Sequence, residues 1–385
     1  MLLDYETLKL IWWMLVGALL IGFAITDGMD MGVGNLLPFL GKTDEERRVI
    51  INTVGPHWDG NQVWLITAGG AIFAAWPAVY AAAFSGFYMA MLLVLFALFF
   101  RPVGFDYRSK IDNPKWRNRW DWGLFVGGAI PSLIFGVAFG NLLQGVPFHL
   151  DQFLKAHYEG SFIFALLPLL NPFAILAGLV SVAMLTLHGA LWLQLRTEGV
   201  LAERARKAAT YAGFATVVLF ALGGVWILFG GIEGYRIVSQ PPLDALPNPL
   251  AKEVVRDSGA LLAIYSQFPI AILAPVTGLA ATALAVLLSR ASRPGFAYTF
   301  SALGMTGIIS TAGLSMFPFV MPSSSNPSSS LTIWDAPSSH LTLTVMFWAV
   351  VIFLPIVLAY TVWCYARMWG KVTVAEIQNR SHSAY

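Results

Sequence analysis

The residues best suited to chemistry are two acids in the first apolar stretch of the chain. Asp27 and Asp30 are three positions apart, so on a helix they lie on one face. An ionised carboxylate is costly in apolar surroundings, so such acids usually face protein or water and are often functional. If both are buried, their repulsion keeps at least one protonated. We predict a proton path or a structural network here; a simple helix-end cap is the alternative.

A second polar cluster follows Pro56, directly before a mostly apolar stretch that ends at Ala75. A polar group without a partner in such surroundings costs several kcal/mol. The cluster must therefore line water, contact another subunit or satisfy itself. Proline followed by an acid also caps many helices, and that interpretation stays open for Asp59. The side chains of this cluster that can hydrogen-bond are His57, Trp58, Asp59, Asn61 and Gln62.

Metal and haem chemistry find little support in the sequence. The single cysteine, Cys364, excludes an internal disulfide, a four-cysteine zinc site and a cysteine-ligated iron–sulfur cluster on this chain alone. No two histidines have helical spacing, and no Cys-x-x-Cys-His motif is present. We predict no metal and no bound cofactor on this chain, and we interpret His188 and His340 as hydrogen-bonded core or interface residues. The histidines are His57, His149, His157, His188, His340 and His382.

The elements that carry these residues are predicted to be membrane-spanning helices. Of the 385 residues, 57% are hydrophobic and only 11% are charged, whereas soluble domains carry about 25% charged residues. The net charge of +2 is too small to indicate nucleic-acid binding. A hydrocarbon core about 30 Å thick takes roughly 20 apolar residues per helix. We predict an all-α integral membrane protein with about nine spans, at 8–34, 57–75, 78–100, 122–143, 162–195, 208–231, 260–289, 296–317 and 340–368, with a tight turn at Pro77.

The distribution of basic residues predicts the orientation. With the N-terminus outside, 18 of the 23 Lys and Arg residues fall in inward-facing segments and 5 fall outside, as the positive-inside rule requires. The C-terminus is then cytoplasmic, and Asp27 and Asp30 belong to the inner half of the membrane.

The chain is predicted to form one polytopic membrane domain over residues 1–385. Gly17 precedes Asp27-Gly28 by ten residues, and Gly178 precedes His188-Gly189 by ten. This echo would suit two four-helix units, at about 1–145 and 160–318, followed by a ninth helix at about 340–368.

Six segments spread in order along the whole chain resemble the second subunit of the cytochrome bd-type ubiquinol oxidases. Their length and spacing also fit that family. The segments are ITDGMDMGVG (25–34), GPHWDGNQVWLITAGGAIFAAWP (55–77), FRPVGFDYRSK (100–110), FGNLLQGVPF (139–148), MFPFVMPSS (316–324) and SLTIWDA (330–336).

This resemblance implies a subunit of a quinol:oxygen oxidoreductase in the bacterial inner membrane. In the family, a first subunit carries two b-type haems and haem d, and one or two small single-helix proteins complete the complex. Quinol is oxidised, dioxygen is reduced to water, and the protons come from the cytoplasm, which generates a gradient without pumping. Some members hold a structural quinone or lipid in the second subunit. The chain alone is not expected to be catalytic.

Carried over to this sequence, the resemblance implies roles for individual residues. Asp59 matches the proposed inward entry for protons, and Asp30 and Asp27 match acids that accompany it. Trp64 matches a residue proposed near the mouth of an oxygen channel. Two other functions remain to be weighed: a proton-coupled secondary transporter, which intramembrane acids and glycine-broken helices would suit, and a scaffold subunit without chemistry of its own.

Overall fold

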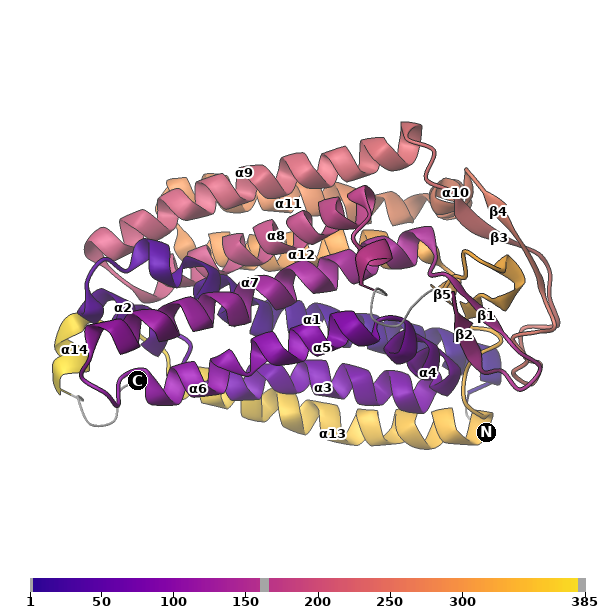
Figure 1. Cartoon of the computed structure of the whole chain (residues 1–385), viewed down its shortest axis with the longest axis horizontal. Coiled ribbons are helices and arrows are strands. Elements are labelled where there is room, and N and C mark those ends of the chain that lie inside the picture. Colours follow the sequence, from indigo (N-terminus) through magenta and orange to yellow (C-terminus); the bar gives the residue numbers. More distant parts are fainter. Residues whose placement is uncertain (1–2, 160–165, 380–385) are drawn as a thin grey trace.

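The computed structural model describes residues 3–159 and 166–379. Long helices run side by side along the longest axis, and short strands gather at one end of the molecule (Figure 1). The helices are α1 (Tyr5–Leu40), α2 (Asp44–Asn52), α3 (Trp58–Ala75), α4 (Pro77–Gly86), α5 (Tyr88–Leu98), α6 (Phe100–Tyr107), α7 (Pro114–Gln144), α8 (Pro172–Arg196), α9 (Gly199–Phe229), α10 (Ala260–Gln267), α11 (Leu273–Arg290), α12 (Pro294–Met316), α13 (His340–Arg367) and α14 (Val374–Asn379). Among the described residues, 3-10 turns at Leu167–Leu169, Pro269–Ile272 and Pro327–Ser329 join some of these helices.

Seven helical segments of the described ranges are long and apolar enough to cross a membrane. The helices α3 and α12 coincide with two further predicted spans but are not among the seven, so the number nine stays a prediction. The seven segments are Tyr5–Leu40, Tyr88–Tyr107, Pro114–Gln144, Pro172–Arg196, Gly199–Phe229, Pro269–Arg290 and His340–Arg367.

Three of the predicted spans differ from the observed helices. The span predicted at 78–100 is broken at Phe87 into α4 and α5. The span at 260–289 is broken before Pro269, because a residue that precedes proline is disfavoured in the helical conformation. The span at 162–195 includes residues outside the described part; its helix begins at Pro172, with the Asn171 side chain accepting from the Ala174 N–H as an N-cap.

Helices α1 and α8 cross at very close range in the middle of the bundle. A Cβ atom added at Gly32 would overlap the carbonyl oxygen of Leu185, and one added at Gly189 would overlap the backbone of Gly32. Glycine at such crossings lets two backbones approach each other. The buried His188 next to Gly189 bonds the Ile25 carbonyl through Nε2 (3.1 Å) and Ser301 Oγ through Nδ1 (3.0 Å), so it joins α1, α8 and α12.

At the end of the bundle on the right of Figure 1, loops and strands of the described residues form three small antiparallel sheets. A buried ion pair, Lys252 Nζ to Asp335 Oδ2 at 2.9 Å, holds two of these loops together. Lys9 of α1 donates to the carbonyls of Leu243 (2.7 Å) and Trp334 (2.8 Å), which fixes the loops to the first helix. The paired strands are β1 (Phe148–Leu150) with β2 (Ala156–Tyr158), β3 (Gly234–Ser239) with β4 (Glu253–Asp257), and β5 (Phe319–Met321) with β6 (Leu331–Thr332).

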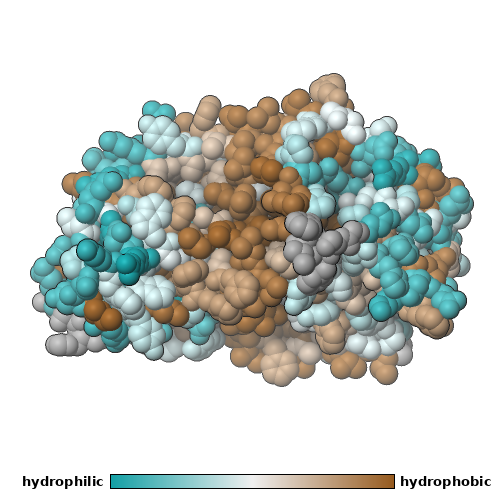
Figure 2. Space-filling view, viewed as in Figure 1, coloured by the Kyte–Doolittle hydropathy of each residue, from teal (hydrophilic) through white to brown (hydrophobic). Residues whose placement is uncertain are grey.

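The surface is that of a multi-pass membrane protein. Figure 2 shows a broad hydrophobic band across the middle of the molecule between two hydrophilic ends. Helix α13, at the lower edge of Figure 1, is the least covered of the seven candidate spans: only 6% of its most apolar stretch is buried, against 61% for α8. Apolar side chains exposed in this way need lipid or a partner subunit around them.

Candidate functional site

A buried ion pair between α1 and α6 forms the centre of the site. The guanidinium of Arg101 grips Asp27 with both terminal nitrogens, Nη1 to Oδ2 at 2.8 Å and Nη2 to Oδ1 at 2.5 Å. Both side chains are withdrawn from solvent. A two-point bond between guanidinium and carboxylate is strong and directional, so Asp27 is fully committed to this one partner.

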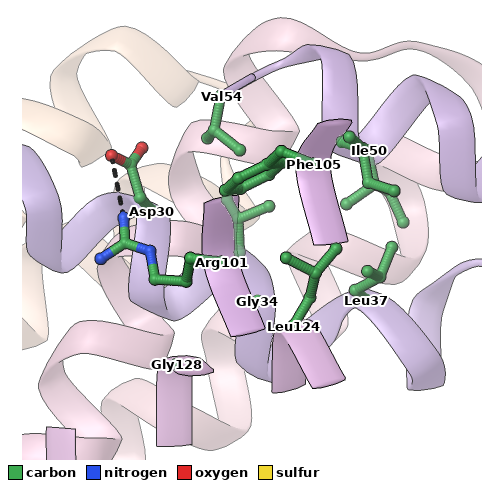
Figure 3. Close-up of a pocket in the computed structure, with 11 residues that line it drawn as sticks. Asp30, Gly34, Leu37, Ile50, Val54, Arg101, Phe105, Leu124 and Gly128 are labelled. Carbon is green, nitrogen blue, oxygen red and sulfur yellow. Dashed lines mark ion pairs between the residues drawn. The ribbon is translucent and has the colours of Figure 1, made fainter. Parts of the chain in front are cut away.

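Asp30, one turn along α1, is held much less completely. Its Oδ2 accepts from Asn61 Nδ2 at 2.9 Å and lies 3.6 Å from Arg101 Nη2, the contact dashed in Figure 3. Its Oδ1 is buried and has no hydrogen-bond donor among the described residues, although His57 Nδ1 lies 3.9 Å away. One guanidinium thus faces two carboxylates, and Asp30 is the one that keeps a buried oxygen without a hydrogen-bond donor among the described residues.

A chain of polar side chains connects Asp30 to the last helix of the bundle. Tyr365 of α13 donates to Asn61 Oδ1 at 2.7 Å, and Asn61 Nδ2 lies 3.1 Å from His57 Nδ1. His57 Nε2 bonds the Thr53 carbonyl at 3.1 Å. A carbonyl can only accept, so Nε2 carries the proton and Nδ1 accepts from Asn61. These two bonds fit a neutral imidazole at His57, beside Asp30.

The rest of the second polar cluster is divided between the core and the surface. Trp58 stacks on Phe105, with ring centroids 5.2 Å apart, and lies under the Arg101 guanidinium at 5.7 Å. Asp59 is exposed, and no hydrogen bond joins its carboxylate to any described residue. Gln62 is half-buried and is not brought into the Asp30 network.

The structure also places Trp64, the residue matched to an oxygen channel. It is half-buried on α3, where its ring covers Gly22 of α1. A Cβ atom at Gly22 would lie 2.7 Å from the ring, so glycine makes room for the indole.

A small cavity adjoins the carboxylate pair (Figure 3). It holds about 10 Å³, which is enough for roughly one water molecule. Asp30 and Arg101 form its polar side, and apolar side chains from α1, α2, α6 and α7 form the remainder. Its lining is Asp30, Val33, Gly34, Leu37, Ile50, Ile51, Val54, Arg101, Phe105, Leu124 and Gly128.

Sequence reasoning missed two members of this site. Arg101 was counted with the inward-facing basic residues and lies in the segment 100–110, but it was given no partner, although an arginine directly after an apolar run can also turn inward to a buried acid. Tyr365 is 304 positions from Asn61, and no spacing rule pairs residues so far apart.

The histidines of the described helices make hydrogen bonds within the chain. Both ring nitrogens of His57 and both of His188 are engaged in hydrogen bonds, and His340 bonds the Leu3 carbonyl through Nε2. Within the described ranges, no three His, Cys, Asp or Glu side chains are arranged to hold a metal ion. The chemistry of this site is that of carboxylates, a guanidinium and a hydrogen-bonded chain.

A mostly helical bundle with candidate membrane spans and a buried carboxylate–guanidinium cluster places the chain in the class of multi-pass membrane proteins. A family model described as cytochrome bd terminal oxidase subunit II matches residues 8–368. The chain belongs to this family, as the resemblance predicted. It is therefore subunit II of a quinol:oxygen oxidoreductase complex in which haem and quinol are used and a first subunit is the partner.

Similar proteins span the whole length of the chain. Over 384 residues it is 56% identical to cytochrome bd-I ubiquinol oxidase subunit 2 of Escherichia coli K12, with all of both chains covered. It is 34% identical to cytochrome bd ubiquinol oxidase subunit 2 of Bacillus subtilis, covering 95% of this chain and 97% of that one. The bd oxidase structure from Geobacillus thermodenitrificans matches its fold with a TM-score of 0.66 at 15% identity, covering 94% of this chain and 98% of the other.

Proposed function

We propose that this subunit conducts protons from the cytoplasmic surface to the interior of the oxidase complex. The observation that carries the proposal is a difference in hydrogen bonding between the two buried acids. Asp27 is neutralised by a two-point bond to Arg101, whereas Asp30 keeps one carboxylate oxygen without a donor beside a water-sized cavity. Asp27 and Arg101 stay as a fixed ion pair, and Asp30 takes up and releases the proton.

Asp59 is the entry in this proposal. It lies in the first turn of α3 and is exposed, and the N-terminus of this helix has no side-chain cap. His57 and Asn61, on the same turn, contact Asp30 or lie near it. A proton bound at Asp59 therefore has a polar neighbourhood that leads inward. The distribution of basic residues predicts that the N-terminus lies outside and the C-terminus inside. With this orientation, the proposed entry lies on the cytoplasmic side of a bacterial inner membrane.

The haem-bearing partner is proposed to cover the uncovered face of α13 and α3. Val63, Ile66 and Phe73 of α3 and much of α13 are apolar and exposed, and Asp59 lies at the inner end of α3. The two b-type haems and haem d belong to that partner, since the histidine nitrogens of the helical core are already engaged. One or two single-helix subunits, lipid and a structural quinone complete the proposed assembly, and Trp64 is proposed to adjoin an oxygen channel. Haem bands should be absent from the spectrum of the purified chain and present when the partner co-purifies.

The proton path is tested by Asp59→Asn in the assembled complex. Asparagine keeps the ability to cap a helix but cannot exchange a proton. The variant should assemble with unchanged haem content and lose most oxygen consumption, while Asp59→Glu keeps part of it. Asp30→Asn should behave like Asp59→Asn. The matched control is Asp106→Asn. It alters a different exposed acid, which lies on α6 less than two turns from Arg101.

A normal rate of oxygen consumption in assembled Asp59→Asn complex would show that the carboxylate is a cap or a bystander. If both Asp59→Asn and Asp30→Asn turned over normally, the subunit would be a scaffold for the haem-bearing partner. Proton-coupled transport, the remaining alternative, would require solute movement that does not depend on quinol.

A further inference from the structure

The hairpin of β1 and β2 brings two histidines face to face, far from the Asp30 site. His149 and His157 are directly opposite each other in the antiparallel register. Their rings are nearly parallel, with centroids 5.5 Å apart and planes inclined by 19°. Both side chains are exposed at the end of the molecule that holds the strands (Figure 1).

This separation is close to the one that a shared metal ion requires. A zinc–nitrogen bond is about 2.0–2.1 Å, and the ligands of a tetrahedral ion subtend about 109°. With the ring centre roughly 1.1 Å beyond the ligating nitrogen, two imidazoles on one such ion have centroids about 5 Å apart. The observed separation of 5.5 Å is close to this value, but the two planes are nearly parallel, and an ion must lie in the plane of each imidazole that binds it. One exposed ring must therefore turn about its side-chain bonds before both nitrogens point at the same ion.

Asp151 orients one of the two rings. Its Oδ2 accepts from His157 Nε2 at 2.9 Å, while its Oδ1 accepts from the backbone N–H groups of Phe153 (2.8 Å) and Lys155 (3.0 Å). The bond from His157, together with these backbone bonds, lowers the pKa of the Asp151 carboxyl. A carboxylate accepts from Nε2–H and thereby leaves Nδ1 of His157 with its lone pair, which is how carboxylates commonly orient metal-binding histidines.

We propose that this hairpin binds one divalent transition-metal ion, such as Zn²⁺ or Cu²⁺, between His157 Nδ1 and the imidazole of His149. Water completes the coordination, since the described residues provide no third ligand in place. Such an open site exchanges its ion with the medium, unlike a closed structural site with four protein ligands. Imidazole ligands also favour Cu²⁺ over Zn²⁺.

The experiment uses the purified complex and two metal probes. Equilibrium dialysis with Zn²⁺ should give one more bound equivalent for the natural chain than for the double variant His149→Ala/His157→Ala. In electron paramagnetic resonance, added Cu²⁺ should show coupling to two imidazole nitrogens, and the double variant should lose this signal. Asp151→Asn should bind about 10- to 100-fold more weakly, the usual effect of removing a carboxylate that orients a ligand.

Gln152→Ala, an exposed change in the same hairpin loop, is the matched control and should bind like the natural chain. Equal zinc stoichiometry in the natural chain and the double variant would overturn the proposal. So would a Cu²⁺ spectrum that the double variant leaves unchanged. The two rings would then be a cross-strand stacking pair that only stabilises the hairpin. Neither result depends on the proton path, because the readout is metal binding and not turnover.

Discussion

Removing the positive charge from the buried cluster should be among the most damaging single changes in this subunit. Arg101→Leu deletes both bonds to Asp27 and the 3.6 Å contact with Asp30. Two carboxylates then share a buried site without a counter-charge. Removing one member of a buried ion pair typically costs 3–5 kcal/mol, which lowers the ratio of folded to unfolded protein by roughly 100- to 4,000-fold.

A double variant separates this electrostatic cost from lost packing. Replacing both members of a buried pair by apolar residues is often neutral or stabilising, so Arg101→Leu/Asp27→Leu should recover much of the loss. The assay is thermal unfolding of the purified complex, monitored by tryptophan fluorescence. The yield of assembled complex is measured as a second readout. The melting temperature should be lowest for Arg101→Leu and intermediate for the double variant. A double variant that melts below Arg101→Leu, or a single variant that melts normally, would refute the reasoning.

Two other predictions concern packing and orientation. Gly32→Ala places a methyl group against the carbonyl of Leu185 and should destabilise the protein by about 1–3 kcal/mol, as overpacking usually does. The melting temperature should fall accordingly. The control is Gly17→Ala, where nothing lies within 4 Å of the added Cβ, and it should melt normally. Reporters fused near Lys110 should be cytoplasmic and one near Asn326 external, and the reverse result would contradict both the orientation and the cytoplasmic entry at Asp59.

Several features of the fold could be predicted because they depend on local composition and periodicity. Long apolar stretches interrupted by charged loops predict membrane helices whatever their neighbours are, since lipid leaves backbone groups no other partners. The start of α8 at Pro172 is also local, because Asn171 caps it within three residues, but the span predicted at 162–195 set this start too early. The break at Phe87 was missed because an apolar run does not reveal where its helix changes direction. The break before Pro269 was also missed, although the proline marks it in the sequence.

The sequence by itself determined the class of the protein and its family and singled out Asp27 and Asp30 as candidates, because these depend on residue types and on motifs within a few turns. Only the tertiary structure decided which acid is neutralised. The sequence does not distinguish Asp27 from Asp30. In the structure, Arg101 of α6 donates two hydrogen bonds to Asp27, whereas Asp30 accepts its hydrogen bond from Asn61. Which acid is neutralised depends on how α1, α3 and α6 pack against one another. The angle at which helices pack depends on the side chains of both contacting surfaces, which a single stretch of sequence does not contain.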